Sequence, residues 1–294
     1  MMHDKDICGI SMEAVKTGVV DTESLLYGAG RSVIKGAGFE YIDFRPYSYG
    51  DDIRYVDWRL SARLIKGEEH QLIVKEFMSE RRVEVLIALD LSKTMMYWEK
   101  PFIAIYVASI LLSVSRKLED TTYLVILNGK NYILSPYTKP SDNLRFLTKT
   151  ICGESWGSIG ESIETLIKLL PNFKNLRDII LITDYAHKPQ IYNKLGIVAR
   201  ALNSSLSIII SSSIHEQYPP LRKAYLFYKS PAGKLIYGNV SKVYDKIKIH
   251  ILKCRAYLRK TTPYHLELKS VKEAREIKHK IINTYLSSRQ KIIS

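Results

Sequence analysis

The chain has 294 residues, of which 46% are hydrophobic and 25% are charged, so a wholly disordered chain is excluded. The length suffices for one large α/β domain with additions. The net charge of +14 comes from one region: residues 221–294 hold 18 Lys and Arg against 4 Asp and Glu, whereas residues 1–220 hold 26 of each sign. We therefore expect a basic surface near the C-terminus, most simply a solvated helix face.

Three features predict a cytoplasmic protein. Cys8, Cys152 and Cys254 are odd in number and far apart, which predicts neither a disulfide framework nor a zinc site. The N-terminus has charged residues in its apolar runs and lacks the apolar core of a signal peptide. The longest apolar stretch, 102–114, is shorter than the roughly 20 residues of a spanning helix. We expect a reducing location and no membrane insertion.

Residues 1–82 differ from the rest of the chain in their residue pattern. Gly28, Gly30, Gly36 and Gly38 precede an aromatic and charged segment. Closely spaced glycines interrupt helices and strands alike. The pattern predicts an irregular or β-rich N-terminal elaboration over 1–82.

From residue 83 onward, short apolar runs alternate with helical patterns. Strands are predicted at 83–89, 123–127, 178–183 and 206–210, with helices at 101–118, 159–170 and 189–202. A hairpin through Asn128-Gly129 places 132–135 at a sheet edge. Beyond residue 240, two basic helices flank a short strand at 265–268. Residues 83–294 therefore form an α/β domain with a doubly wound, mostly parallel, Rossmann-like sheet.

A candidate metal site follows two of the predicted strands. Asp90, Ser92 and Thr94 lie in one turn after the first strand, and Asp184 follows another apolar strand. Carboxylate and hydroxyl oxygens suit a hard cation, so we predict Mg²⁺, Mn²⁺ or another divalent cation there. The alternative is that these side chains only cap helices and turns.

This arrangement resembles the metal-ion-dependent adhesion site of von Willebrand factor A domains, whose first motif is Asp-x-Ser-x-Ser. The resemblance implies a von Willebrand factor A-like fold with Asp90, Ser92, Thr94 and Asp184 as metal ligands. The family's second element is a threonine before a helix, and the matching segment here is 154–160. Ser158 is its nearest hydroxyl, whereas an alignment on Gly160 places Gly157 at the ligand position.

A longer resemblance lies before the first strand, where residues 45–63 read RPYSYGDDIRYVDWRLSAR. This segment resembles the signature of the family known as domain of unknown function 58. Relatives combine it with a von Willebrand-like domain and are commonly linked to MoxR-type AAA+ ATPases. The resemblance therefore implies an ATPase of that type as the protein partner. The signature residues considered are Arg45, Gly50, Asp51, Asp52, Arg54, Asp57, Trp58 and Arg63.

The signature has two physical interpretations. Its acids and arginines can form bidentate ion pairs around Trp58, which would lock the segment in place. Alternatively, Trp, Tyr and Arg side chains can form a recognition surface. We favour the structural interpretation.

The expected function is a metal-dependent protein-binding adaptor and not an enzyme. The motifs that would indicate nucleotide binding, a zinc protease or a serine hydrolase are missing, and the seven histidines are scattered. One alternative is a phosphatase of the haloacid dehalogenase class with Asp90 as nucleophile, although Ser92 stands where that class has its second acid. The other is electrostatic nucleic-acid binding through the C-terminal helices. Its candidate residues are Lys242, Tyr244, Lys246, Lys253, Arg255, Tyr257, Arg259 and Lys260.

Overall fold

The computed structural model describes residues 4–28, 41–48, 53, 56–63, 65–66, 69–70, 72–77, 83–217, 225–229 and 235–290. The chain forms two compact units. The larger unit combines Met1–Glu23 with Arg82–Ser294, and the smaller unit is Ser24–Arg81.

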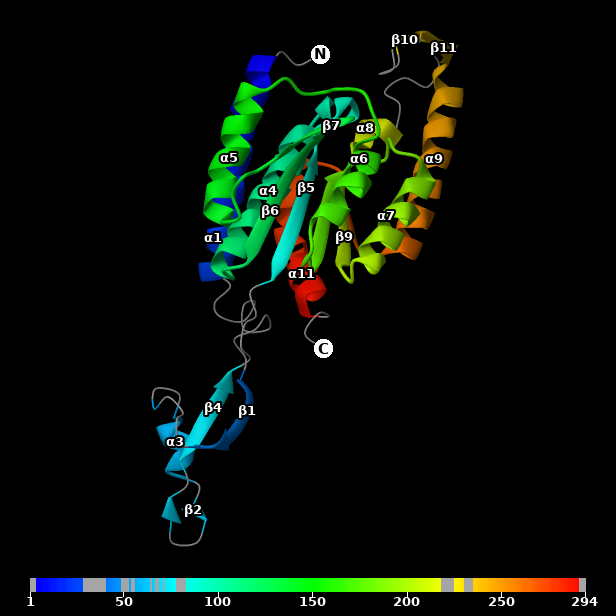
Figure 1. The fold of residues 1–294 in the computed structure, drawn as a ribbon. Coiled ribbons are helices and arrows are strands. Elements are labelled where there is room, and N and C mark those ends of the chain that lie inside the picture. Colours follow the sequence, from blue (N-terminus) through cyan, green and yellow to red (C-terminus); the bar gives the residue numbers. More distant parts are fainter. Residues whose placement is uncertain are drawn as a thin grey trace. The chain divides into compact units, whose positions relative to one another are not determined.

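The larger unit is built on a six-stranded sheet with the strand order β12-β9-β8-β5-β6-β7 (Figure 1). All neighbouring pairs are parallel except β6 and β7, which form the predicted hairpin at the sheet edge. This confirms a mixed α/β fold with a mostly parallel sheet. The strands are β5 (Glu84–Asp90), β6 (Thr121–Asn128), β7 (Asn131–Leu134), β8 (Asp178–Thr183), β9 (Ser205–Ser211) and β12 (Tyr264–Leu268).

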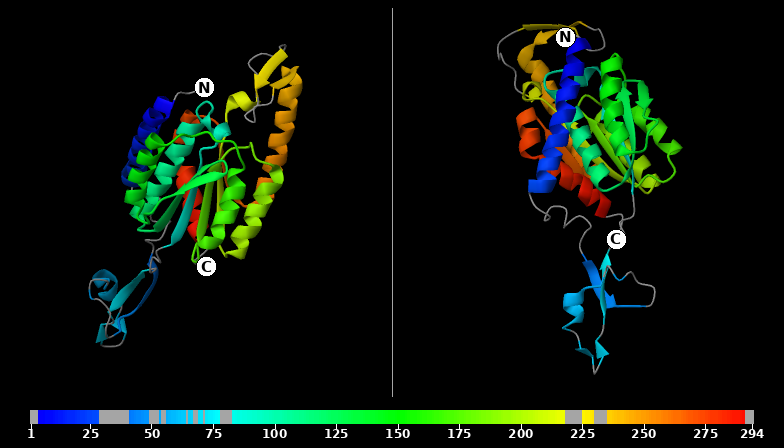
Figure 2. Two further views of the ribbon diagram at one scale, coloured as in Figure 1. Left: turned by 45° about the horizontal axis from the view of Figure 1, so that its top comes forward. Right: turned by 90° about the vertical axis from the view of Figure 1, so that its left-hand side faces the viewer.

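Helices cover both faces of this sheet (Figures 1 and 2). One face packs against α4 (Lys100–Lys117), α5 (Pro140–Gly153) and α11 (Lys278–Gln290), with α1 (Asp4–Gly28) and α10 (Val271–Glu276) beside them. The other face packs against α6 (Ser162–Leu169), α7 (Pro189–Ala201) and α9 (Val240–Thr261). Short connecting elements are η2 (Lys93–Met96), η3 (Leu170–Asn172), α8 (Ile214–Gln217) and the hairpin β10 (Tyr225–Lys229) with β11 (Leu235–Asn239).

The core explains why these runs form central strands. β8 is buried along its whole length, as expected for a parallel strand covered on both faces. Helix α4 is buried on nearly all sides because the sheet contacts one side and other helices contact the rest. Helix α1 approaches α4 closely at Gly18, where an added Cβ would lie 1.8 Å from the Ser109 hydroxyl oxygen. The sequence pattern did not predict this use of α1.

Residues 4–23 of helix α1 belong to the larger unit, although the sequence pattern placed them in the elaboration over 1–82. Its Asp21 carboxylate accepts a hydrogen bond from the Tyr106 hydroxyl at 2.9 Å. Arg275 and Lys278 also donate to Asp21, at 3.1 and 2.9 Å. These charge-assisted contacts join α1 to α4 and to the C-terminal helices.

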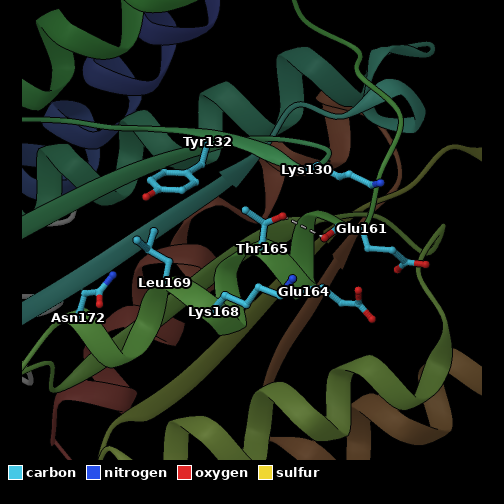
Figure 3. A pocket seen from close by; sticks show the side chains of 8 residues that line it. All are labelled: Lys130, Tyr132, Glu161, Glu164, Thr165, Lys168, Leu169 and Asn172. Carbon is cyan, nitrogen blue, oxygen red and sulfur yellow. Dashed lines mark hydrogen bonds between the residues drawn. The ribbon is translucent and has the colours of Figure 1, made fainter.

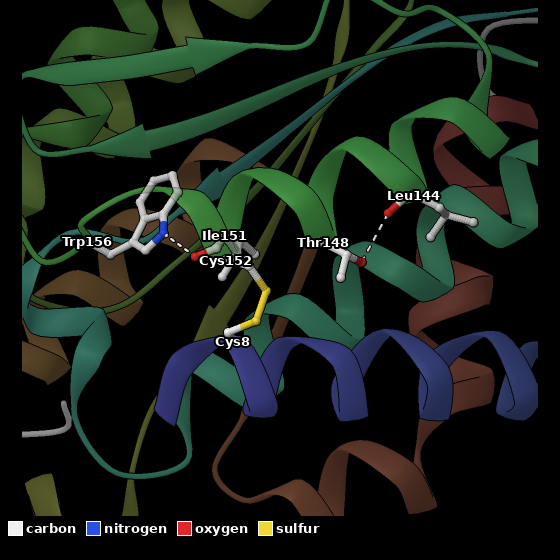
Figure 4. The surroundings of a disulfide bond; sticks show 6 residues. All are labelled: Cys8, Leu144, Thr148, Ile151, Cys152 and Trp156. Carbon is white, nitrogen blue, oxygen red and sulfur yellow. Dashed lines mark hydrogen bonds between the residues drawn. A yellow bond between two sulfur atoms is a disulfide. The ribbon is translucent and has the colours of Figure 1, made fainter. Parts of the chain in front are cut away.

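A disulfide links Cys8 in α1 to Cys152 at the end of α5 (Figure 4). The expectation that the cysteines form no disulfide was wrong, because residues 144 positions apart in sequence meet across two packed helices. Cys254 is free and buried. The cysteines therefore no longer support a cytoplasmic location, which stays a prediction. Within the described residues, no helix has the length and hydropathy needed to span a bilayer.

The smaller unit contains short antiparallel pairs. Strand β1 (Tyr41–Pro46) pairs with β4 (Ile73–Phe77), and β2 (Ile65–Lys66) pairs with β3 (Glu69–His70). Helix α3 (Trp58–Ser61) begins after Asp57, whose carboxylate accepts hydrogen bonds from the backbone N–H groups of Arg59 and Leu60, both at 3.0 Å. Asp57 thus caps the helix.

Candidate functional site

The candidate site lies at the carboxyl edge, the edge of the sheet where β5, β8 and β9 end. β5 and β8 are parallel neighbours, with Leu89 opposite Ile182. Asp90 and Asp184 therefore leave adjacent strands at the same edge, as the sequence predicts. Open α/β sheets form their ligand crevices at this edge.

Asp90 is fully buried and accepts hydrogen bonds at both carboxylate oxygens. Its Oδ1 accepts from the Ser92 backbone N–H and the Ser162 hydroxyl, both at 2.9 Å. Its Oδ2 accepts from the Thr183 hydroxyl at 2.8 Å and from His187 Nε2 at 3.1 Å. Burial alone would raise the pKa of Asp90, but the bond and charge of His187 hold that pKa below its ordinary value, aided by Ser92 and Thr183.

Asp184 is buried as well, and its partner is a buried lysine. Lys100 Nζ lies 2.9 Å from Asp184 Oδ2, and each side chain is 1% exposed. The same ammonium contacts Glu216 of α8, while the Ala186 backbone N–H donates to Asp184 Oδ1 at 2.9 Å. Burial opposes the charge of Lys100, yet the two carboxylates raise its pKa above the ordinary value. Lys100 therefore carries a positive charge within the site.

His187 lies between two acids. Its Nε2 faces Asp90, and its Nδ1 lies 3.9 Å from a carboxylate oxygen of Glu161. Burial lowers the pKa of His187, but the bonds to Asp90 and Glu161 prevail and raise it to about 10. The His187 contact in turn lowers the pKa of Glu161 to about 2. The imidazole is thus part of the ion-pair network.

Above these groups is a small crevice of about 100 Å³. Its shape comes from the loop after α5, where the Lys93 backbone N–H donates to the Ser158 carbonyl at 3.1 Å. The crevice therefore gathers three of the predicted hydroxyl ligands, while Asp90 and Asp184 lie beneath its wall. Its lining consists of Ser92, Lys93, Thr94, Ser158, Ile159, Gly160, Glu161, Ala186 and His187.

The two carboxylates do not fit a divalent cation in this arrangement. A cation needs oxygen lone pairs at about 2.0 to 2.6 Å, whereas each Asp90 oxygen already accepts two hydrogen bonds and Asp184 Oδ2 faces the Lys100 ammonium. The described residues also contain no group of three or more His, Cys, Asp or Glu side chains that could hold a metal ion. The Mg²⁺ or Mn²⁺ site expected from the sequence stays a prediction.

Sequence reasoning missed the residues that complete this network: Lys100, Ser162, Thr183 and His187. His187 follows Asp184 by three residues, but lone histidines were expected to be ordinary core or surface residues. Lys100 directly precedes Pro101 at the start of α4, a position that reads as a solvated helix end. The only sequence signal for a buried Lys100 was its position at the start of an apolar helix.

Around the crevice, the carboxyl edge exposes apolar side chains. Trp98 is 57% exposed and stacks on the His215 ring, with ring centroids 4.2 Å apart. Its backbone has a φ of +57°, a left-handed conformation that a bulky residue rarely adopts. Ile159 and Ile214 are also more than half exposed. This rim consists of Tyr97, Trp98, Ile159, Ile214 and His215.

The signature residues lie in the smaller unit. Gly50, Asp51, Asp52 and Arg54 lie outside the described residues, and Arg45 is in β1. Asp57 caps α3, and Arg63 is exposed. Trp58 is 61% exposed, and the ion-pair cluster expected around it stays a prediction, because several of its charged residues lie outside the described residues.

A second cavity of about 420 Å³ lies between the β6–β7 hairpin and α6 (Figure 3). Thr165 on α6 donates a hydrogen bond to the Gly129 carbonyl at 3.0 Å and so holds the hairpin to the helix. Lys130, Lys168, Glu161 and Glu164 all line the cavity, and Glu161 borders both this cavity and the crevice. Mixed charge gives the cavity no single ligand preference.

Helix α9 carries the basic surface expected near the C-terminus. Lys242, Lys246, Lys253, Arg259 and Lys260 are exposed on it. Arg255 instead pairs with Glu267 at 2.8 Å, so it is not free for an external anion. Nucleic-acid binding through this helix stays a prediction.

The fold and site define an α/β protein with a charged network beneath its carboxyl edge. The model of one family, described as protein of unknown function DUF58, matches residues 43–219, and the chain belongs to this family.

Solved structures are also similar. BatB, a conserved hypothetical protein from Bacteroides thetaiotaomicron, is 16% identical, with 70% of this chain and 98% of that chain covered and a TM-score of 0.43. An aerotolerance-related membrane protein from Bacteroides fragilis, with multiple mutations to serines, is 17% identical with the same coverage and a TM-score of 0.47. No curated protein matches this chain significantly.

Proposed function

We propose that the larger unit is a non-catalytic, von Willebrand factor A-like protein-binding module whose partner contacts the carboxyl edge. The observation that carries this proposal is Trp98, an exposed tryptophan in a left-handed backbone conformation. Such a conformation costs about 1 to 3 kcal/mol and persists where the surroundings enforce it, often at functional sites. Stacking on His215 holds the indole in place.

An exposed, pre-organised tryptophan suits protein recognition. Tryptophan is enriched among the residues that dominate the free energy of protein association. Because the His215 ring already restricts the indole of Trp98, a partner loses less side-chain entropy on binding than it would with a mobile side chain. Ile159 and Ile214 supply further apolar surface at the same edge.

The crevice favours one side chain of the partner. At about 100 Å³ it is smaller than the 300 to 1,000 Å³ of typical ligand pockets. Lys93 and the hydroxyls of Ser92, Thr94 and Ser158 line it and can donate hydrogen bonds to a carboxylate. We therefore assign it an acidic side chain of the partner.

Burial of Asp90 supports a non-catalytic role. An aspartate nucleophile of the haloacid dehalogenase type must contact its substrate, but Asp90 is 0% exposed and lies beneath the crevice wall. Its four hydrogen bonds also lower the nucleophilicity of its carboxylate.

The partner proposed is a MoxR-type AAA+ ATPase, as the family resemblance implies, and the place of contact is proposed to be the cytoplasm. The sequence further predicts that binding requires Mg²⁺ or another divalent cation. The hydrogen bonds at Asp90 and Asp184 argue for binding without it.

The test is a binding measurement with the purified MoxR-type ATPase of the same organism. Trp98→Ala is expected to weaken binding at least about tenfold, equal to about 1.4 kcal/mol. Val20→Ala, which removes an equally exposed apolar side chain from α1, is the matched control and should bind like the parent. Equal binding by parent and Trp98→Ala would contradict the proposed surface, and robust turnover of a phosphoester panel would contradict the non-catalytic role.

A further inference from the structure

We infer that Lys100 and His187 replace, in this chain, the divalent cation that the adhesion-site motif implies between the two aspartates. The inference concerns the composition of the site and does not depend on the partner proposed above. It predicts a carboxyl edge that is complete without metal.

The first step is the electrostatic problem that the fold creates. Two buried aspartates leave adjacent strands, and Glu216 contacts the same lysine as Asp184. Like charges brought together in a buried site repel, so either a carboxyl group takes up a proton or a cation balances the charge. In this structure the balancing charge is the Lys100 ammonium, because it contacts two of the three carboxylates.

Both oxygens of Asp184 already have donors from the protein. Lys100 Nζ approaches Asp184 Oδ2 at 2.9 Å, and the Ala186 backbone N–H takes the other oxygen. A cation bound at Asp184 Oδ2 would have to displace an ammonium that is 1% exposed. Such displacement would leave the ammonium buried beside a second positive charge, which is unfavourable.

The third step concerns Asp90, where His187 supplies a donor. Nε2 lies 3.1 Å from both Asp90 Oδ2 and the Thr183 oxygen. An ionised carboxylate can only accept, so Nε2 carries the hydrogen, as it does in one neutral tautomer and in the protonated ring. His187 therefore fills this position in either charge state.

The fold holds both donors, Lys100 and His187, in position. Lys100 is anchored at the first turn of α4, and its carbonyl accepts a hydrogen bond from the Ser211 hydroxyl at 3.3 Å. His187 is 4% exposed and forms part of the crevice wall. Both donors are thus held by the same loops and helices that shape the site.

The test is a titration of the full chain with Mn²⁺. The electron paramagnetic resonance signal of free Mn²⁺ measures how much of the ion is bound. Binding at this site is defined as the bound Mn²⁺ that the parent has and Asp184→Asn lacks, which separates it from weak surface binding. At millimolar Mn²⁺, the parent and Asp184→Asn are expected to bind the same amount. One equivalent of Mn²⁺ bound by the parent and lost in Asp184→Asn would overturn the inference.

A gain of function provides the second arm. In Lys100→Met/His187→Leu the carboxylates lose both donors, so Mn²⁺ binding that depends on Asp184 is expected to appear. Lys100→Ala alone, which frees Asp184 and retains the His187 contact, tests the Asp184 part of this gain if the double variant does not fold. Absence of Mn²⁺ binding in a folded variant would overturn the equivalence between these side chains and the cation.

Discussion

Lys100 and Asp184, 84 residues apart in sequence, form an ion pair of 2.9 Å in which both side chains are 1% exposed. The contact ties the first turn of α4 to the residue after β8. It therefore connects the loops that shape the crevice to α4 and to β8, which is buried along its whole length.

Loss of this lysine should destabilise the fold. Lys100→Met leaves the Asp184 carboxylate buried without its cation, and the expected loss is about 3 to 5 kcal/mol in the free energy of unfolding. Lys188→Met is the matched control, because Lys188 pairs with Glu161 but is 75% exposed, and its expected effect is about 0 to 1 kcal/mol. Equal effects in denaturant titrations of the two variants would contradict the buried pair.

The disulfide should stabilise the larger unit. It closes a loop with a sequence separation of 144, and its removal in Cys8→Ser/Cys152→Ser should lower the free energy of unfolding by about 2 to 5 kcal/mol. Thiol labelling of the denatured, non-reduced chain checks the pairing directly. One labelled cysteine, Cys254, is expected, and three would show that the bridge does not form.

Asp178 should make stability depend on pH. Burial raises its pKa to about 7, against an ordinary value of 3.8, although Ser288 donates a hydrogen bond to it at 2.6 Å. The folded chain therefore holds a proton that the unfolded chain releases. This contribution is fully present below pH 3.8 and is lost as the pH rises to about 7.

Denaturant titrations between pH 4 and about 7 measure this loss. Asp178→Asn retains the shape of the side chain but does not titrate. In that variant, the contribution of Asp178 to the change of the free energy of unfolding with pH should vanish. Identical pH profiles for the parent and Asp178→Asn would contradict the raised pKa.

In the smaller unit, Asp57 should act through helix capping. Asp57→Ala removes the acceptor for the Arg59 and Leu60 N–H groups and should cost about 0.5 to 2 kcal/mol. Asp57→Asn retains an acceptor oxygen and should cost less. Amide hydrogen exchange at Leu60 reports the difference, and equal exchange in both variants would show that the cap does not stabilise α3.

Much of the sheet could be predicted from the sequence because its strands are apolar runs. The run at 178–183 matches β8, and the aspartates after β5 and β8 lie at one edge because parallel neighbours end together. Helix α1 was not predicted. Its buried residues include Ser11, Asp21 and Thr22, so polar residues interrupt its apolar stripe, and the partners of Asp21 lie on distant helices.

The same reason limited prediction of the site. Asp90 and Asp184 stand out locally, but Lys100 and His187 become site residues only when the fold brings them to the two aspartates. A resemblance in motif therefore located the site and could not identify what balances its charge. The disulfide was missed likewise, since Cys8 and Cys152 meet through the packing of α1 on α5.

We propose that the carboxyl edge recognises its partner without a divalent metal. The most direct test is the affinity of the parent chain for the nucleotide-free MoxR-type ATPase, measured with Mg²⁺ and with chelator. The two affinities are expected to agree within about twofold, or roughly 0.4 kcal/mol. Binding that disappears in chelator and returns with Mg²⁺ would contradict it.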